Sequence, residues 1–114
     1  MAHGFPRSLR LRKRREFLAV QSAGLAVHTR YFILLVKRDG AGRVGITVSK
    51  KIGNSVVRNR VKRLVREAVR RWGDVPWVPA GRDVVVVAKR SARTAGLDEV
   101  ARDLEKSRDK VAAC

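Results

Sequence analysis

Apolar residues recur with helical spacing along three segments of the chain. The clearest segment is 55–72, where they fall at i, i+4, i+7, i+8, i+11, i+12 and i+15: Val57, Val61, Leu64, Val65, Ala68, Val69 and Trp72. This stripe predicts an amphipathic helix, and Asn54 or Ser55 can cap its start. Residues 13–23 predict a first helix that ends at the glycine after it. Residues 97–112 predict a last amphipathic helix.

Three other segments have the patterns of β-strands. Residues 26–38 are rich in β-branched and aromatic side chains and predict one strand, long enough to bend or split. In 43–50, apolar residues alternate with small or polar ones, which is typical of a half-buried strand. The continuous β-branched run in 82–89 predicts a buried strand. Turn and loop compositions at 39–42 and 73–81 separate these elements.

The order helix, strand, strand, helix, strand, helix predicts the α+β class, with helices packed on a small sheet. A length of 114 residues is near the mode for one domain, so we expect a single domain over 1–114. Residues 1–10 are basic and contain Gly4 and Pro6, which predicts a flexible arm.

The charge of the chain limits the kinds of molecule that it is expected to bind. A formal net charge of +17 attracts polyanions over long distances, so nucleic acid is the first candidate and an anionic membrane surface a distant second. The longest apolar runs, 31–36 and 84–88, fall far short of the roughly 20 residues that span a bilayer. The single cysteine, Cys114, can form no internal disulfide, which fits a reducing compartment. We therefore expect a cytoplasmic protein without membrane contact.

The polar side of the predicted 55–72 helix is strongly basic. It carries Arg58, Asn59, Lys62, Arg63, Arg66 and Arg70. A merely solvated face is the alternative, but such a face usually mixes charges, and like charges at i, i+4 destabilise a helix by a few tenths of a kcal/mol each. Phosphate binding explains the pattern better.

The acidic residues and histidines of the chain do not have the patterns of a protein active site. Metal-dependent nucleases commonly use clustered carboxylates, yet the chain has ten acidic residues, and its one adjacent pair, Asp98 and Glu99, fits the start of a helix. His3 lies in the arm, and His28 has no partner at ligand spacing. We predict no catalytic residue and no metal site in the protein, which disfavours a protein-only nuclease.

Residues 43–71, "RVGITVSKKIGNSVVRNRVKRLVREAVRR", closely resemble the protein subunit of bacterial ribonuclease P. The hallmark of that family is an RNR segment, here Arg58-Asn59-Arg60, followed by Lys62 and Arg63. The segments 11–24 and 82–93 also resemble the family, so the match covers nearly the whole chain. A structural ribosomal or nucleoid protein is the alternative that composition alone leaves open.

The resemblance implies a mixed sheet in which the central helix joins parallel strands by a left-handed crossover, against the usual right-handed rule. It implies a large catalytic RNA that uses Mg²⁺ to remove the 5′ leader of precursor tRNA. The protein itself would need no cofactor and would bind as a monomer, one copy per RNA. A cleft between the first helix and the sheet would hold the single-stranded leader.

The resemblance also assigns residues. Contacts to the catalytic RNA fall to Arg58, Asn59, Arg60, Lys62, Arg63, Arg66 and Arg70. The leader cleft falls to Phe17, Arg30, Lys50 and Lys51. Gln21 and Leu35 replace aromatic residues common in the family, so leader binding here should depend more on charge than on stacking. The alternative for Phe17 is a core aromatic that anchors the first helix.

Overall fold

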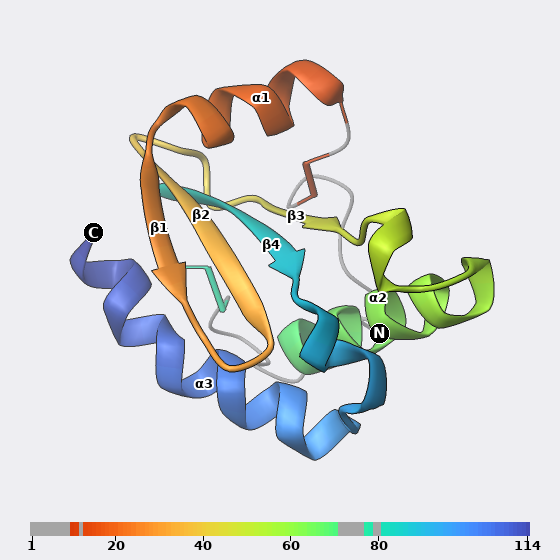
Figure 1. Ribbon diagram of the computed structural model, residues 1–114. Helices are drawn as coiled ribbons and strands as arrows, with labels where there is room; N and C mark the ends of the chain where they lie inside the picture. Colours follow the sequence, from red (N-terminus) through yellow and green to blue (C-terminus); the bar gives the residue numbers. More distant parts are fainter. Residues whose placement is uncertain (1–9, 12, 71–76, 79–80) are drawn as a thin grey trace.

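A four-stranded mixed sheet forms the centre of the protein, and helices pack on both of its faces (Figure 1). The computed structural model describes residues 10–11, 13–70, 77–78 and 81–114. The strands, in the spatial order of the sheet, are β1 (Leu25–His28), β2 (Phe32–Arg38), β4 (Arg82–Ala88) and β3 (Val44–Thr47). Neighbouring strands are antiparallel except β3 and β4, which are parallel.

Different helices cover the two faces of this sheet. The α-helices are α1 (Arg14–Ser22), α2 (Ser55–Arg70) and α3 (Leu97–Ala113), and the short 3₁₀ helices are η2 (Lys50–Ile52) and η3 (Arg90–Thr94). On one face, Val20 of α1 packs with Val85 of β4. On the other face, α2 and α3 bury their apolar stripes in the main core, against β4 residues such as Val84 and Val86. The central strand β4 is therefore buried from both sides, as its continuous valine run predicts.

The predicted α+β class and single sheet are confirmed, and most predicted elements begin and end within a few residues of the observed ones. Asn54 caps α2 by accepting a hydrogen bond from the backbone N–H of Val57 at 3.1 Å. The crossover between the parallel strands β3 and β4 contains α2; its left-handed sense stays an expectation. Except for Arg10, which bridges to Val44, the predicted arm lies outside the described residues.

The predicted strand 26–38 is in fact two strands joined by a tight turn. The Asp103 carboxylate of α3 gathers the turn by accepting three hydrogen bonds, from the Thr29 hydroxyl (2.6 Å), the Arg30 N–H (3.2 Å) and the Tyr31 N–H (3.0 Å). These bonds satisfy the polar groups of the turn and fix the hairpin on α3. No local sequence pattern indicates where the two strands separate, because the carboxylate that accepts the hydrogen bonds of the turn lies more than 70 residues further along the chain.

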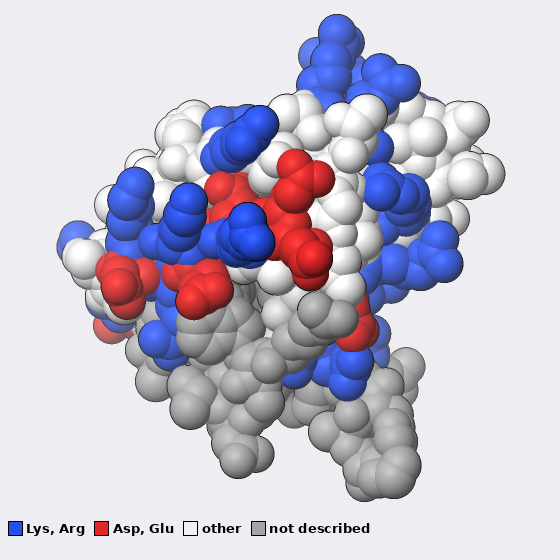
Figure 2. Space-filling view, turned by 90° about the horizontal axis from the view of Figure 1, so that it is seen from below, with Lys and Arg blue, Asp and Glu red and all other residues white. Residues whose placement is uncertain are grey.

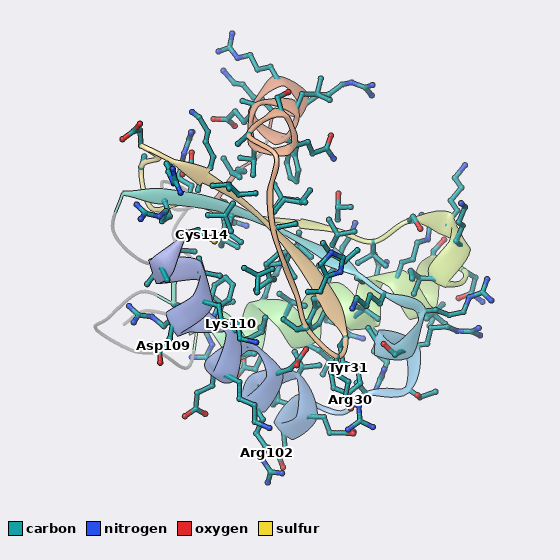
Figure 3. All side chains as sticks on the ribbon, turned by 60° about the vertical axis from the view of Figure 1, so that its left-hand side comes forward. Arg30, Tyr31, Arg102, Asp109, Lys110 and Cys114 are labelled. Carbon is teal, nitrogen blue, oxygen red and sulfur yellow. The ribbon has the colours of Figure 1, made fainter. Side chains whose placement is uncertain are left out.

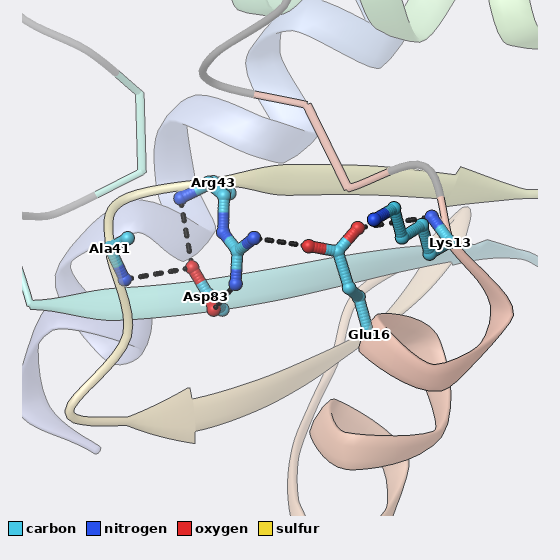
Figure 4. A network of polar contacts seen from close by, with 5 residues as sticks. All are labelled: Lys13, Glu16, Ala41, Arg43 and Asp83. Atoms are coloured by element: carbon cyan, nitrogen blue, oxygen red, sulfur yellow. Dashed lines mark hydrogen bonds and ion pairs between the residues drawn. The ribbon is translucent and has the colours of Figure 1, made fainter.

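A network of charged side chains fixes α1 on the sheet (Figure 4). The guanidinium group of Arg43 forms ion pairs with Glu16 of α1 and, at 3.0 Å, with Asp83 of β4. Asp83 also accepts hydrogen bonds from the backbone N–H groups of Ala41 and Arg43, both at 3.0 Å. Burial alone would raise the pKa of Asp83, but the hydrogen bonds from Arg43 and Ala41 outweigh it and lower the pKa below its ordinary value.

The lowered pKa of Asp83 predicts a pH-dependent stability. Its contribution is complete above the unfolded pKa of about 3.9 and is lost as the pH falls through the lower folded pKa. Asp83→Asn should therefore reduce the free energy of unfolding by about 1–3 kcal/mol at pH 7, measured by urea denaturation. The difference from the wild type should shrink below about pH 4. A difference in unfolding free energy that does not change with pH would contradict this role of the Asp83 carboxylate.

Candidate nucleic-acid interface

The strand register sets two rows of side chains across the α1-facing side of the sheet. The first row consists of Ala26, Leu35, Val85 and Gly45. It runs beneath α1, and two of its members, Val85 on β4 and Gly45 on the edge strand β3, are buried. The second row consists of His28, Ile33, Val87 and Thr47. No member of this second row is buried. We call it the open row, because α1 leaves it accessible.

Phe17 of α1 packs over the first row, in the same small cluster against which Val87 of the open row also packs. Its ring packs against Gly45, where a Cβ atom would lie 2.7 Å from two ring carbons. The side chain of Phe17 is half-buried and belongs to the small cluster beneath α1, together with Leu35. The contact agrees with the alternative in which Phe17 anchors α1, while its role in a leader cleft stays a prediction, for which part of the ring surface is accessible. Gln21, one turn further along α1, is exposed.

A pocket beside Phe17 brings in a residue from α2. Its lining includes Phe17, Arg10, Gly45 and Arg66. Arg66 of the predicted α2 face and Phe17 of the predicted leader cleft therefore border the same pocket. Lys50 and Lys51 are both exposed in η2, which follows the end of β3. Four parts of the fold thus contribute to this region. Helix α1 gives the aromatic ring, the sheet gives the open row, and α2 and η2 give the cations.

The structure does not bring Arg30 to this cleft. Arg30 lies in the turn between β1 and β2, at the end of the hairpin away from α1 (Figure 3). Its guanidinium carbon is 5.3 Å from the centre of the Tyr31 ring, and it lines a pocket with Asp103, Lys106 and Lys110 of α3. The hydrogen bonds between the turn and Asp103 explain this position.

The predicted basic face of α2 is present but not uniform. Asn59, Arg63, Arg66 and Arg70 are exposed, and Arg58, Arg60 and Lys62 are half-buried. Two of the cations have partners within the protein. Arg70 pairs with Glu67 at 2.5 Å, and Arg60 donates hydrogen bonds to two backbone carbonyls, of Arg93 and Ala95. In the described part of the chain, no acidic side chain forms an ion pair with Arg63.

Among the residues that the structure describes, no group of three or more His, Cys, Asp or Glu side chains is arranged to hold a metal ion. No helix among these residues is long and apolar enough to cross a membrane.

A comparison with protein families matches the ribonuclease P family over residues 5–112. The chain belongs to this family. It is 45% identical over 101 residues to the ribonuclease P protein component of Brevibacillus brevis, covering 86% of this chain and 79% of that one. It is 41% identical over 102 residues to the same component of Citrifermentans bemidjiense, covering 88% of this chain and 85% of that one.

Solved structures of the family have the same fold. The ribonuclease P protein of Thermotoga maritima superposes with a TM-score of 0.76 at 32% identity, covering 89% of this chain and 96% of that chain. The Staphylococcus aureus protein gives a TM-score of 0.75 at 30% identity, covering 91% of this chain and 94% of that chain. As a ribonuclease P protein component, the chain has an RNA partner and takes part in tRNA processing.

The sequence alone did not indicate the structural roles of Gly45 and Arg43 in this ribonuclease P protein. Gly45 provides the space for the Phe17 ring, and Arg43 holds α1 in the position that leaves the open row accessible. The position of Gly45 within a predicted strand could have indicated its contact with another side chain, because glycine in a strand often marks a place where another group approaches the backbone closely. No comparable signal exists for Arg43, whose partners are distant in sequence.

The contact between Phe17 and Gly45 can be tested through stability. Gly45→Ala should lower the free energy of unfolding by about 1–3 kcal/mol, because the added methyl group overlaps the ring and forces it to move. In a Phe17→Ala background the same substitution should cost less than half as much, since the obstructing ring is gone. Equal costs in the two backgrounds, measured by urea denaturation, would show that the ring is not the obstacle.

Proposed function

We propose that the protein binds the 5′ leader of precursor tRNA along the open row and binds the catalytic RNA of ribonuclease P through the basic face of α2. The observation that carries this proposal is the open row itself, an accessible strip of sheet with apolar Ile33 and Val87 at its centre, which has the Phe17 ring and the exposed Lys50 and Lys51 in its surroundings. Single-stranded RNA is typically bound on such surfaces, where bases stack on aromatic rings and basic side chains follow the backbone.

The open row suits a single strand better than a duplex. Ile33 and Val87 offer an apolar floor, and Phe17 offers one ring for stacking, while Lys50 and Lys51 supply positive charge at one end. Leu35 is packed beneath α1 and offers no ring. Stacking is worth about 1–3 kcal/mol per base, so Phe17 should carry most of the stacking that this surface provides.

The basic face of α2 suits structured RNA. Its exposed cations lie outside the apolar stripe by which α2 packs in the core with α3, and Arg66 also lines the pocket beside Phe17. Phosphate contacts from such a face position a protein on RNA without reading its sequence. Within this proposal, cleavage is carried out by the RNA with Mg²⁺, and one monomer binds each RNA in the cytoplasm. The protein contributes substrate affinity and no cofactor of its own.

Family membership disfavours the alternative of a ribosomal or nucleoid protein. The function is tested by reconstitution with the ribonuclease P RNA of the same organism. At low Mg²⁺, addition of the protein should increase 5′ cleavage of precursor tRNA. No effect on cleavage under any Mg²⁺ concentration would contradict the proposed function.

Two substitutions should separate the two surfaces. Phe17→Ala should weaken binding of precursor tRNA to the holoenzyme by roughly ten- to a hundredfold, the equivalent of one lost stacking contact, and should spare mature tRNA, which has no leader. Arg63→Ala should weaken assembly with the catalytic RNA and make the slope of log affinity against log salt shallower by up to about one. It should leave the ratio of precursor to mature tRNA binding unchanged.

Circular dichroism must first show that each variant is folded, since truncation of a buried Phe can cost about 3–5 kcal/mol. If folded Phe17→Ala protein binds precursor and mature tRNA in the wild-type ratio, Phe17 is a packing residue and the leader lies elsewhere.

A further inference from the structure

The short helix η3, which joins β4 to α3, exposes two arginines that the surfaces described above do not include. Both Arg90 and Arg93 are exposed. Among the residues that the structure describes, no acidic side chain forms an ion pair with either of them. Unpaired cations on a well-ordered turn are available to bind phosphate groups.

The backbone of η3 is held at its start by the hairpin turn between β1 and β2. The backbone N–H of Lys89 donates to the carbonyl of Tyr31 at 2.8 Å, and the Lys89 ammonium group donates to the carbonyl of Thr29 at 2.5 Å. The Ser91 hydroxyl donates to the carbonyl of Arg30 at 2.8 Å. Within η3, Ala92 is fully buried. Arg90 therefore projects from a fixed base.

The end of η3 is held by α2. The guanidinium group of Arg60 donates hydrogen bonds to the carbonyl of Arg93 at 3.1 Å and to the carbonyl of Ala95 at 2.8 Å. Carbonyls at the end of a helix lack partners within the helix and need such donors. A planar guanidinium can serve two acceptors at once, which a lysine ammonium cannot do in the same geometry. Two hydrogen-bond donors of Arg60 are thus occupied by backbone carbonyls of the protein itself.

This contact joins the cations of η3 to those of α2. Arg60 is three residues, less than one helical turn, from Arg63 on α2, and η3 lies beside α2 in the fold (Figure 1). The exposed side of α3 is different, because α3 carries five of the ten acidic residues of the chain: Asp98, Glu99, Asp103, Glu105 and Asp109. Figure 2, which views the molecule from below, shows acidic and basic side chains intermixed over this region. Apart from Glu67, which pairs with Arg70, a polyanion on the α2 face would therefore meet η3 before it meets the acidic side chains of α3.

We propose that Arg90 and Arg93 bind phosphate groups of the catalytic RNA, and that Arg60 positions η3 for this contact. The inference rests on the proposed function, in which the α2 face binds that RNA. It extends the binding surface onto η3 and changes the role of Arg60 from an RNA ligand to a positioning residue.

The phosphate contacts are tested by measuring affinity for the catalytic RNA alone over a series of KCl concentrations. Arg90→Ala and Arg93→Ala should each weaken binding about three- to tenfold and make the slope of log affinity against log salt shallower by somewhat less than one, the value for a single lost phosphate contact. The matched control is Arg102→Ala, which removes one exposed charge from α3. The control should stay within twofold of the wild type.

The arms of this experiment separate the two proposals. If Arg63→Ala weakens binding but Arg90→Ala and Arg93→Ala match the Arg102→Ala control, the inference about η3 is overturned and the proposed function stands. If the wild-type protein does not bind the RNA, both are overturned.

The role of Arg60 requires a double-substitution cycle on the same affinity. Arg60→Ala should weaken RNA binding at a temperature where circular dichroism shows it folded, and Arg60→Lys should not restore the affinity. In a background that carries both Arg90→Ala and Arg93→Ala, Arg60→Ala should add less than a twofold loss, because the contacts that it positions are already gone. Additive losses would mean that Arg60 binds RNA directly, and unchanged affinity would mean that it only stabilises the fold. Either result overturns the positioning role.

Discussion

The two ion pairs of Arg43 determine where α1 lies, and most of the proposed RNA chemistry depends on that position. One pair reaches Glu16 on α1 and the other reaches the almost completely buried Asp83 on β4. The helix is thereby held over one end of the sheet. Its apolar side covers the row that contains Val85 and Gly45, and the next row stays accessible. A helix held only by apolar contacts could shift along the sheet and cover the open row, since hydrophobic contacts are not directional.

The scarcity of acidic residues gives the few that exist a large structural influence. With 27 basic and ten acidic residues, the chain has a strong self-repulsion that opposes compaction. Asp83 and Glu16 hold α1, and Asp103 holds the β1–β2 turn on α3. Acidic residues therefore fix internal junctions, and half of them lie in α3. The one acidic residue of α2, η2 and η3 is Glu67, which pairs with Arg70, and the other cations of these helices form no ion pair within the described part of the chain. Charge is thus separated between the part of the surface that would meet RNA and the part that would not.

The elements could be predicted from sequence where a local pattern determines them. The apolar stripe of 55–72 and the valine run of 82–89 each fix an element and its buried side, and both agree with the structure. The 26–38 segment was predicted less well, because a carboxylate from a distant helix decides that it turns. The same limit applies to individual site residues. The basic face of α2 is visible as a periodicity, but the bonds of Arg60 to η3 and the place of Arg30 depend on tertiary contacts.

The central claim is that the open row and the α2 face bind different RNAs, and site-directed photo-crosslinking tests it most directly. In a Cys114→Ser background, a benzophenone maleimide is attached to Thr47→Cys in the open row or to Asn59→Cys on α2, and the holoenzyme is reconstituted with precursor tRNA. The label at position 47 should crosslink to leader nucleotides, and the label at position 59 should crosslink to the catalytic RNA. Crosslinks from position 47 to the catalytic RNA alone, or leader crosslinks from position 59, would contradict the account.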